Sequence, residues 1–257
     1  MVLRCVYTDL DGTLLGEGAS LFRTGDGAFT LLPARALEAC HRAGVEVVCV
    51  SGRRRAQVME DARLLGQRSY VFEVGSGVVV DGEAQWLVGS YAPRDGLSPH
   101  ELIERSGAPA LLLEAYAGRL EEHAPWHLGR EVSHVFRGVV EVEQANELLA
   151  AEGHAQLRLV DNGEIEAGRR CYHLIPAAAS KAGAVALHMR ARGLAPAQCI
   201  AVGDSREDLG IAPQVGRFFL VANAARGLGT GLDNVRRTEA GHGEGFYEAV
   251  VRSLAER

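Results

Sequence analysis

The sequence is almost without lysine. Of its 27 lysine and arginine residues, only Lys181 is a lysine, and the chain is rich in alanine and glycine. We attribute this to a GC-rich coding bias that placed arginine wherever a generic surface cation sufficed. An ammonium and a guanidinium differ in hydration and geometry, and they are not interchangeable at a functional site. Lys181 is therefore expected where a compact cation is required.

The chain also lacks the features of several protein classes. Its five cysteines form no C-x-x-C pair, which predicts small buried side chains in a reducing compartment. No apolar run approaches the ~20 residues of a membrane helix, and a strand begins within three residues of the start, so we expect no membrane span and no signal peptide. A net charge of −6 argues against nucleic-acid binding. The expectation is a cytoplasmic monomer or homodimer that binds neither nucleic acid nor a membrane.

Strand-like and helix-like segments alternate at both ends of the chain. Strands are expected at 3–8, 45–50, 70–80, 171–175, 198–202 and 217–221. Helices are expected at 33–43, 54–65, 181–192 and 245–256. This alternation predicts an α/β fold, with a doubly wound (Rossmann-like), mostly parallel sheet as its core.

The middle of the chain has a different composition. It holds four of the eight prolines, both tryptophans and most of the histidines. Helices are expected there around 99–105 and 143–152, strands at 111–115, 133–141 and 157–160, and a tight turn at 161–163. We therefore predict an inserted α+β cap domain at 83–170, within a core domain formed by residues 1–82 and 171–257.

The most informative motif follows the first strand and reads Asp9-Leu10-Asp11-Gly12-Thr13. Strand side chains have a period of two, so the carboxylates of Asp9 and Asp11 point the same way. Gly12 lets the backbone leave the strand at an angle that other residues resist. Two acids held together repel each other unless a cation lies between them. The motif predicts a Mg²⁺ site in which one aspartate is also a nucleophile, with an ordinary Asp-rich turn as the alternative.

Three further motifs fall at strand ends or at a helix start. They are Ser51-Gly52-Arg53, Lys181 after its helix cap Ser180, and Gly203-Asp204 followed by Asp208. Ligands of open α/β sheets bind at the carboxyl ends of the strands. The motifs therefore converge on one crevice. Ser51 also suits a helix cap, Arg53 suits a solvated or structural base, and Asn223 suits a strand-end turn.

These four motifs, in this order, resemble those of the haloacid dehalogenase (HAD) superfamily of Mg²⁺-dependent phosphohydrolases, and the resemblance covers the whole chain. The position of the insert resembles that of the type IIB, or Cof-like, cap subfamily. The resemblance implies that Asp9 is the nucleophile that forms an aspartyl phosphate, and that Asp11 is the general acid and then base. It implies that Ser51, Gly52 and Lys181 bind the phosphate.

The same resemblance implies a Mg²⁺ site built from Asp9, Asp11, Asp204 and Asp208. Asp11 is expected to contribute its backbone carbonyl, and Asp208 to support the site through water or hydrogen bonds. The family often has an asparagine before the last aspartate, where this chain has Glu207.

The substrate contacts are expected near Arg170-Cys171-Tyr172-His173, a stretch similar to that of mannosyl-3-phosphoglycerate phosphatases. Arg170 and His173 are therefore candidate substrate-binding residues, since an arginine can bind a carboxylate through two hydrogen bonds. A histidine at the edge of the core is the alternative for His173. The Ser51-Gly52-Arg53 motif departs from the Ser/Thr-Lys-Thr form of that group.

The sequence thus predicts a Mg²⁺-dependent phosphomonoester hydrolase that acts on a small phosphorylated sugar or glycoside, of which mannosyl-3-phosphoglycerate is one example. Two alternatives stay open. One is a phosphosugar mutase of the same superfamily, and the other is a noncatalytic protein that binds a phosphorylated metabolite.

Overall fold

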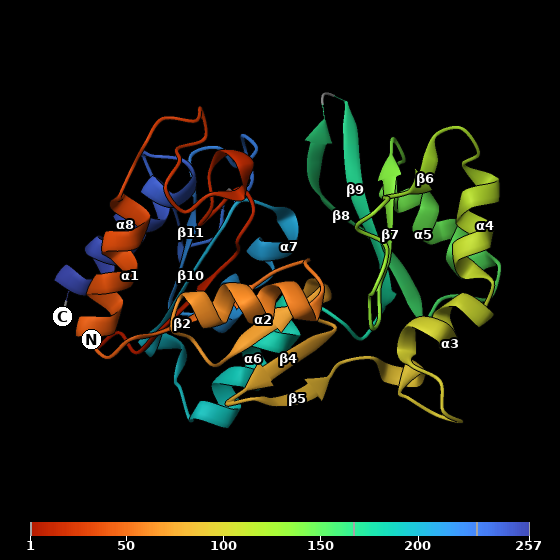
Figure 1. The fold of residues 1–257 in the computed structure, drawn as a ribbon, viewed down its shortest axis with the longest axis horizontal. Coiled ribbons are helices and arrows are strands. Elements are labelled where there is room, and N and C mark those ends of the chain that lie inside the picture. Colours follow the sequence, from red (N-terminus) through yellow and green to blue (C-terminus); the bar gives the residue numbers. More distant parts are fainter. Residues whose placement is uncertain (1, 167, 230, 257) are drawn as a thin grey trace.

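The structure is a computed structural model that describes residues 2–166, 168–229 and 231–256. It contains two units, each built around its own β-sheet (Figure 1). The larger sheet has eight strands in the order β12-β11-β10-β1-β2-β3-β4-β5, and the smaller has four in the order β6-β7-β9-β8. Strands β12 to β3 run parallel, while β4 and β5 are added at one edge as an antiparallel meander.

The strands of the large sheet come from both ends of the chain. They are β1 (Cys5–Thr8), β2 (Glu46–Val50), β3 (Tyr70–Phe72), β4 (Gly77–Val80), β5 (Glu83–Trp86), β10 (Cys199–Gly203), β11 (Arg217–Leu220) and β12 (Val235–Arg237). Because β1 pairs with β2 on one side and β10 on the other, three strand ends meet at the middle of the carboxyl edge.

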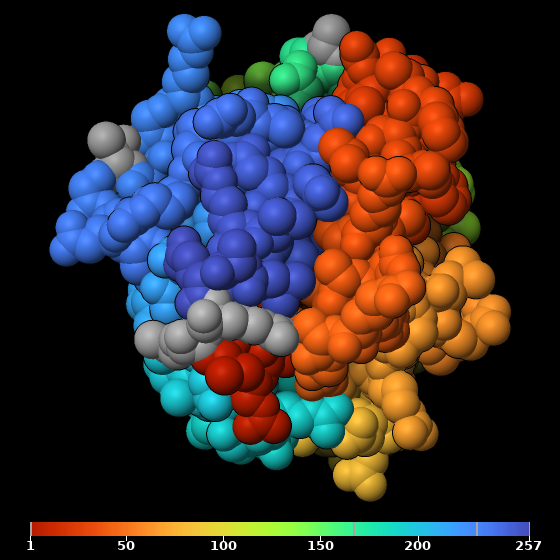
Figure 2. Space-filling model, turned by 90° about the vertical axis from the view of Figure 1, so that its left-hand side faces the viewer, coloured from red at the N-terminus to blue at the C-terminus, as the bar shows by residue number. Residues whose placement is uncertain are grey.

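Helices cover both faces of this sheet. On one face α1 (Leu32–Arg42), α2 (Arg55–Leu64) and α8 (His242–Ala255) bury their apolar sides in a shared core. Figure 2 shows α1 and α8 side by side on the surface. On the other face lies α6 (Lys181–Arg192), and the short α7 (Arg206–Leu209) follows β10. This arrangement confirms the predicted doubly wound α/β core.

The smaller sheet is antiparallel and consists of β6 (Leu120–Glu122), β7 (His134–Gly138), β8 (Leu157–Glu166) and β9 (Arg169–Pro176). Three helices pack on its outer face, away from the large sheet (Figure 1). They are α3 (Pro99–Arg105), α4 (Ala108–Ala115) and α5 (Val142–Ala151). The opposite face of the small sheet is turned toward the carboxyl edge of the large sheet and lines a cavity there.

Two elements of the cap differ from the sequence prediction. The expected strand 111–115 is part of helix α4, which starts after Gly107 in a left-handed conformation and buries Leu112 in the cap core. A short apolar run fits a buried strand and a buried helix equally well. The expected turn at 161–163 is a β-bulge inside β8, with Gly163 at φ +104°. A bulge uses the same turn-forming residues without ending the strand.

The boundaries between the two sheets also differ from the predicted cap at 83–170. Strand β5 pairs with β4 and extends the large sheet to Trp86. Strand β9, expected to resume the parallel core, lies between β7 and β8 in the small sheet. The composition of a buried strand does not specify its partner, and here a tight hairpin pairs β9 with β8.

Two further findings concern the absences noted in the sequence. All five cysteines are free and buried, as predicted. Among the helices of the described residues, none combines the length and the apolar character needed to span a bilayer.

Candidate active site

Three carboxylates meet at the carboxyl edge of the large sheet. Asp9 follows β1 directly, and its N–H donates to the carbonyl oxygen of Val202 on the adjacent β10 (3.1 Å). Asp204 follows β10, and Asp208 lies in α7. Carboxylate oxygens of these aspartates all lie within 4.8 Å of one another. The structure therefore brings together three of the residues expected from the sequence to form a metal site.

The single lysine lies between two of these acids. Lys181 is the first residue of α6, whose N-cap Ser180 accepts a hydrogen bond from the Gly183 N–H. Its Nζ donates to Oδ1 of Asp9 (2.7 Å) and to Oδ1 of Asp208 (2.6 Å), and the residue is 2% exposed. Burial alone would lower the pKa of Lys181, but the Asp208 and Asp9 carboxylates outweigh it and raise that pKa. Lys181 is therefore a fixed positive charge beside Asp9.

Asp208 acts mainly as a support. Its Oδ2 accepts hydrogen bonds from the Asp204 N–H (3.3 Å), the Ser205 N–H (3.1 Å) and the Ser205 hydroxyl (2.6 Å). Because Lys181 occupies the other oxygen, both carboxylate oxygens are engaged. Glu207, in the place of the usual asparagine, pairs instead with Arg158 of the cap (3.0 Å). Asp208 thus orients Lys181 and the loop that carries Asp204.

Asp9 and Asp204 retain oxygens that face the cavity. Burial raises the pKa of Asp9 well above its ordinary value, opposed by Lys181 and reinforced by Asp208 and Asp204. Burial and then the charge of Asp208 raise the pKa of Asp204 to about 7. Three carboxylates against one ammonium leave an excess of negative charge. Oxygen ligands of this kind fit Mg²⁺, which Asp9 and Asp204 would hold.

Asp11 lies outside this cluster, and its side chain faces Arg53. Arg53 donates from Nε to Oδ2 of Asp11 (2.8 Å) and from Nη2 to Oδ1 (2.5 Å). A third hydrogen bond joins Nη1 to Asp61 (2.9 Å). Of the two interpretations given to Arg53, a solvated or a structural base, the structure supports the structural one, since Arg53 holds the expected acid–base residue at the cavity wall.

Two glycines permit close approaches at the site. Gly12 has φ +81°, and a Cβ there would lie 2.4 Å from Oδ2 of Asp204. A Cβ at Gly52 would lie 2.9 Å from the side-chain amide of Asn162 in the cap. The buried Ser51 accepts a hydrogen bond from the Arg53 N–H (3.1 Å) and does not cap α2, which begins after Arg54. The close contacts at Gly12 and Gly52 leave no room for a Cβ, so both motifs need glycine at these positions.

Asn223 has a definite role in the loop arrangement. Its side-chain amide donates to the carbonyl oxygen of Gly12 (2.8 Å), and its Oδ1 accepts from the His242 N–H (2.8 Å). These bonds tie the turn after Asp11 to the start of α8.

The cap contacts the core directly beside the site. Glu73 of the core is buried, and its carboxylate accepts hydrogen bonds from the backbone N–H groups of Glu131, Val132 and Ser133. Arg54 of the core donates to the Leu128 carbonyl oxygen (3.0 Å). These bonds hold one cap loop, residues 123–133, against the core.

A cavity of about 560 Å³ lies between the core and the cap. Its core side carries the acids, Ser51, Gly52 and Lys181. Its cap side includes His123, Trp126, Arg130, Val135, Asn162 and His173. The cavity therefore has an acidic floor with one lysine, and a wall that carries arginine and imidazole.

The two predicted substrate contacts have different positions. His173 on β9 lines the cavity, and no described residue accepts or donates a hydrogen bond at its buried Nδ1. Burial, with the charges of Arg130 and Lys181, lowers the pKa of His173 well below its ordinary value, so the imidazole is neutral near pH 7. Arg170, in contrast, is not among the residues that line the cavity, and its guanidinium pairs with Asp161 (2.5 Å).

The cavity residues that sequence reasoning missed include His123 and Arg130 on the cap side. The concentration of histidines in the insert was a signal for His123. No sequence signal pointed to Arg130, because nothing in its local sequence distinguishes it from the other arginines of the chain.

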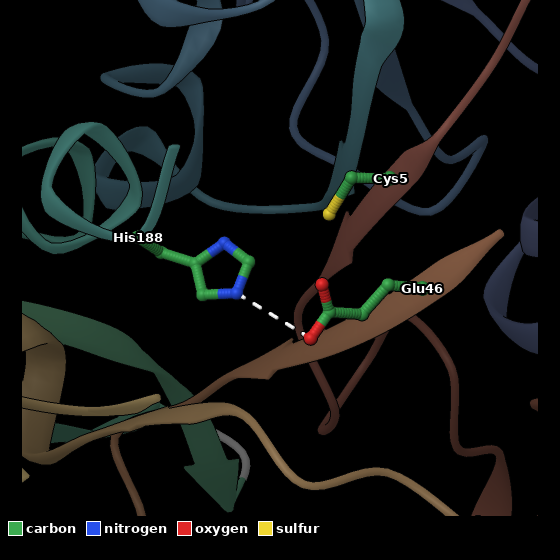
Figure 3. A group of neighbouring side chains, drawn as sticks. All are labelled: Cys5, Glu46 and His188. Carbon is green, nitrogen blue, oxygen red and sulfur yellow. Dashed lines mark ion pairs between the residues drawn. The ribbon is translucent and has the colours of Figure 1, made fainter. Parts of the chain in front are cut away.

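A second group of metal-ligand types lies at the amino ends of β1 and β2 (Figure 3). Its members are Cys5, Glu46 and His188. Glu46 already accepts hydrogen bonds from Arg192 (3.0 Å) and Ser69 (2.8 Å), and it pairs with His188 at 3.5 Å. Burial alone would raise the pKa of Glu46, but its contact with His188 and its hydrogen bonds from Arg192 and Ser69 lower it to about 2. This group is a structural ion-pair network.

Sequence comparison matches the chain to a named phosphatase but to no family model. The chain is 25% identical over 259 residues to a phosphoglycolate phosphatase of Methanothermobacter thermautotrophicus, an alignment that covers 98% of this chain and 99% of that protein.

Solved structures of similar shape include two named hydrolases. The sucrose-phosphatase of Synechocystis, solved with sucrose and phosphate, gives a TM-score of 0.66 at 18% identity and covers 98% of each chain. A haloacid dehalogenase-like hydrolase of Bacteroides thetaiotaomicron gives 0.67 at 15% identity, covering 98% of this chain and 99% of that one. The protein has the fold of HAD-superfamily phosphatases, a Rossmann-like core with a cap, and its similarity to named phosphatases supports phosphatase activity.

Proposed function

We propose that the protein is a Mg²⁺-dependent phosphomonoester hydrolase that works through an aspartyl phosphate on Asp9. The observation that carries this proposal is the position of Asp9. One of its oxygens is held by Lys181 at 2.7 Å, and the residue lines the cavity. A carboxylate in that position is suited to attack phosphorus, because its neighbour Lys181 neutralises charge that the phosphate brings.

The reaction proceeds in two displacements. An Asp9 oxygen forms a bond to phosphorus while the bond from phosphorus to the leaving alkoxide breaks. Asp11 donates a proton to the oxygen of that leaving alkoxide. Asp11 then takes a proton from water, whose oxygen attacks phosphorus and releases Asp9. Lys181 and the Gly52 N–H stabilise the negative charge on the phosphoryl oxygens. Bound Mg²⁺, held by Asp9 and Asp204, would supply further charge neutralisation there.

The substrate is proposed to be a small phosphorylated sugar, glycoside or related acid. The similar proteins include a sucrose-phosphatase and a phosphoglycolate phosphatase, and a cavity of about 560 Å³ admits compounds of either size. We further propose a cytoplasmic monomer or homodimer without a nucleic-acid or membrane partner.

The test is phosphate release from a panel of sugar phosphates, phosphoglycolate and phosphoglycerates. Mg²⁺-dependent release that is lost with excess chelator and in Asp9→Asn supports the proposal. Isomerised sugar phosphate without free phosphate would favour a mutase. Saturable binding without turnover of any compound would favour a binding protein.

A further inference from the structure

We propose that Arg130 binds a carboxylate of the substrate, which makes the preferred substrate a phosphoester with a second acidic group. This inference rests on the proposed phosphatase function and adds the chemical class of the substrate. It assigns the carboxylate to a cap residue other than Arg170, the arginine expected from the sequence.

Arg130 is held in place by hydrogen bonds to two units of the molecule. Its Nε donates to the Trp126 carbonyl oxygen (2.9 Å) within the cap. Its Nη1 donates to the Gly52 carbonyl oxygen (2.9 Å) of the core and to the Ser133 hydroxyl (3.2 Å). Among the described residues, none accepts a hydrogen bond from Nη2. A fixed guanidinium that lines the cavity thus retains one unused nitrogen.

Arg130 also lacks a direct counterion in the part of the chain that is described. No carboxylate there lies within ion-pair distance of it, whereas Arg53 in the same cavity pairs with Asp11 and Asp61. Glu73 attracts Arg130 without contacting it: its carboxylate is already engaged by the Ser133 hydroxyl (2.9 Å) and three backbone N–H groups, and the Ser133 hydroxyl lies between the two charges.

A partly buried cation without a paired anion is costly, and a ligand that supplies the anion offsets that cost. The phosphate is expected on the core side, beside Asp9 and Lys181. Arg130 lies on the cap side of the same cavity. The anion that it would bind is therefore a second group of the same molecule.

The neighbours of Arg130 favour a carboxylate with adjacent hydroxyls. His123 and His173 line the same wall, and burial lowers the pKa of both imidazoles. Neutral imidazoles offer hydrogen bonds to a ligand without adding charge. A purely neutral sugar would leave the guanidinium unpaired, whereas a carboxylate would accept a charge-assisted hydrogen bond from Nη2.

The experiment compares two substrates that differ in the carboxylate, 3-phosphoglycerate and glycerol 3-phosphate. We expect wild-type protein to prefer 3-phosphoglycerate in kcat/KM. Arg130→Gln should lower kcat/KM for 3-phosphoglycerate by about 10- to 100-fold, mostly through KM, since a hydrogen bond to a charged group contributes on this scale. The variant should leave glycerol 3-phosphate within about 3-fold of wild type, which also shows that it folds. Arg130→Lys, which keeps the charge, should recover part of the loss.

Arg170→Gln is the matched control, because it removes an arginine of the cap sheet that does not line the cavity. It should change neither substrate. An equal loss on both substrates in Arg130→Gln would overturn the inference and assign Arg130 to holding the Gly52 loop. Equal wild-type turnover of both compounds would also overturn it, without touching the proposed phosphatase function. Phosphate release from no compound of the panel would instead count against the proposed function itself.

Discussion

Replacing Lys181 with methionine tests how the site is held together. The change keeps the length of the side chain and removes an ammonium that is 2% exposed and donates to Asp9 and Asp208. Removing one partner of a buried ion pair leaves an uncompensated charge and costs about 3–5 kcal/mol. We therefore expect Lys181→Met to lower the free energy of unfolding by about that amount in metal-free protein at pH 8.

The loss should be smaller at pH 6 than at pH 8. Lys181 keeps its charge throughout this range in wild type, because its pKa is raised. In the variant, a carboxylate that has lost its counterion is relieved by taking up a proton, which is easier at lower pH. The assay is urea unfolding at both pH values, with phosphate release measured in parallel and expected to be abolished.

Arg190→Met provides the matched control. Arg190 lies on the same helix, is exposed and makes no ion pair with any described residue, so its loss should cost under ~1 kcal/mol. Wild-type stability of Lys181→Met at pH 8 would show that the buried ion pairs of Lys181 contribute nothing to stability and would contradict this prediction. Adding Asp208→Asn to Lys181→Met should restore part of the stability.

Three further predictions concern charge and position. Glu46→Gln should cost about 2–3 kcal/mol at pH 7, because lowering the pKa of Glu46 from 4.5 to about 2 corresponds to about 3 kcal/mol and solvent screening of this partly exposed carboxylate reduces it. The difference from wild type should shrink as pH falls from about 5 to 2, as urea unfolding would show. The pKa of Asp204 is raised from 3.8 to about 7, so metal-free protein should lose stability as pH rises from about 4 to 7 and level off above 7. Below about pH 7, Mg²⁺ should bind there with proton release, measurable by calorimetry in two buffers. Arg53→Gln should lower kcat by about 10-fold with little change in KM, because it frees Asp11 from a fixed position; steady-state kinetics would contradict this if KM alone changed.

The parts of the site that the sequence predicted are those fixed locally. Asp9 and Asp204 each follow a short buried strand, and Lys181 follows a helix cap. Parallel strands bring their carboxyl ends to one edge, so these positions imply proximity without any knowledge of side-chain contacts. The same reasoning located the helices of the core within one or two residues, apart from the start of α8.

The contacts that sequence reasoning missed depend on tertiary structure. The pairing of Arg53 with Asp11 spans two strand ends, and that of Arg170 with Asp161 depends on a hairpin whose bulge was taken for a turn. Arg130 lines the cavity because the cap loop that carries it is held against the core by Glu73 and Arg54. Strand β9 was assigned to the core because its composition suits either sheet. In each case the local pattern was compatible with more than one partner.

The central claim is that Asp9 carries the phosphoryl group during turnover. The most direct measurement uses a substrate that is radiolabelled in its phosphoryl group. The protein is quenched with acid during steady-state turnover, the labelled peptide is mapped, and its label is tested for release by hydroxylamine. We predict a hydroxylamine-labile label on the peptide that contains Asp9, enriched in Asp11→Asn and absent in Asp9→Asn. Turnover without a protein-bound label in wild type and in Asp11→Asn, or a label that persists in Asp9→Asn, would contradict it.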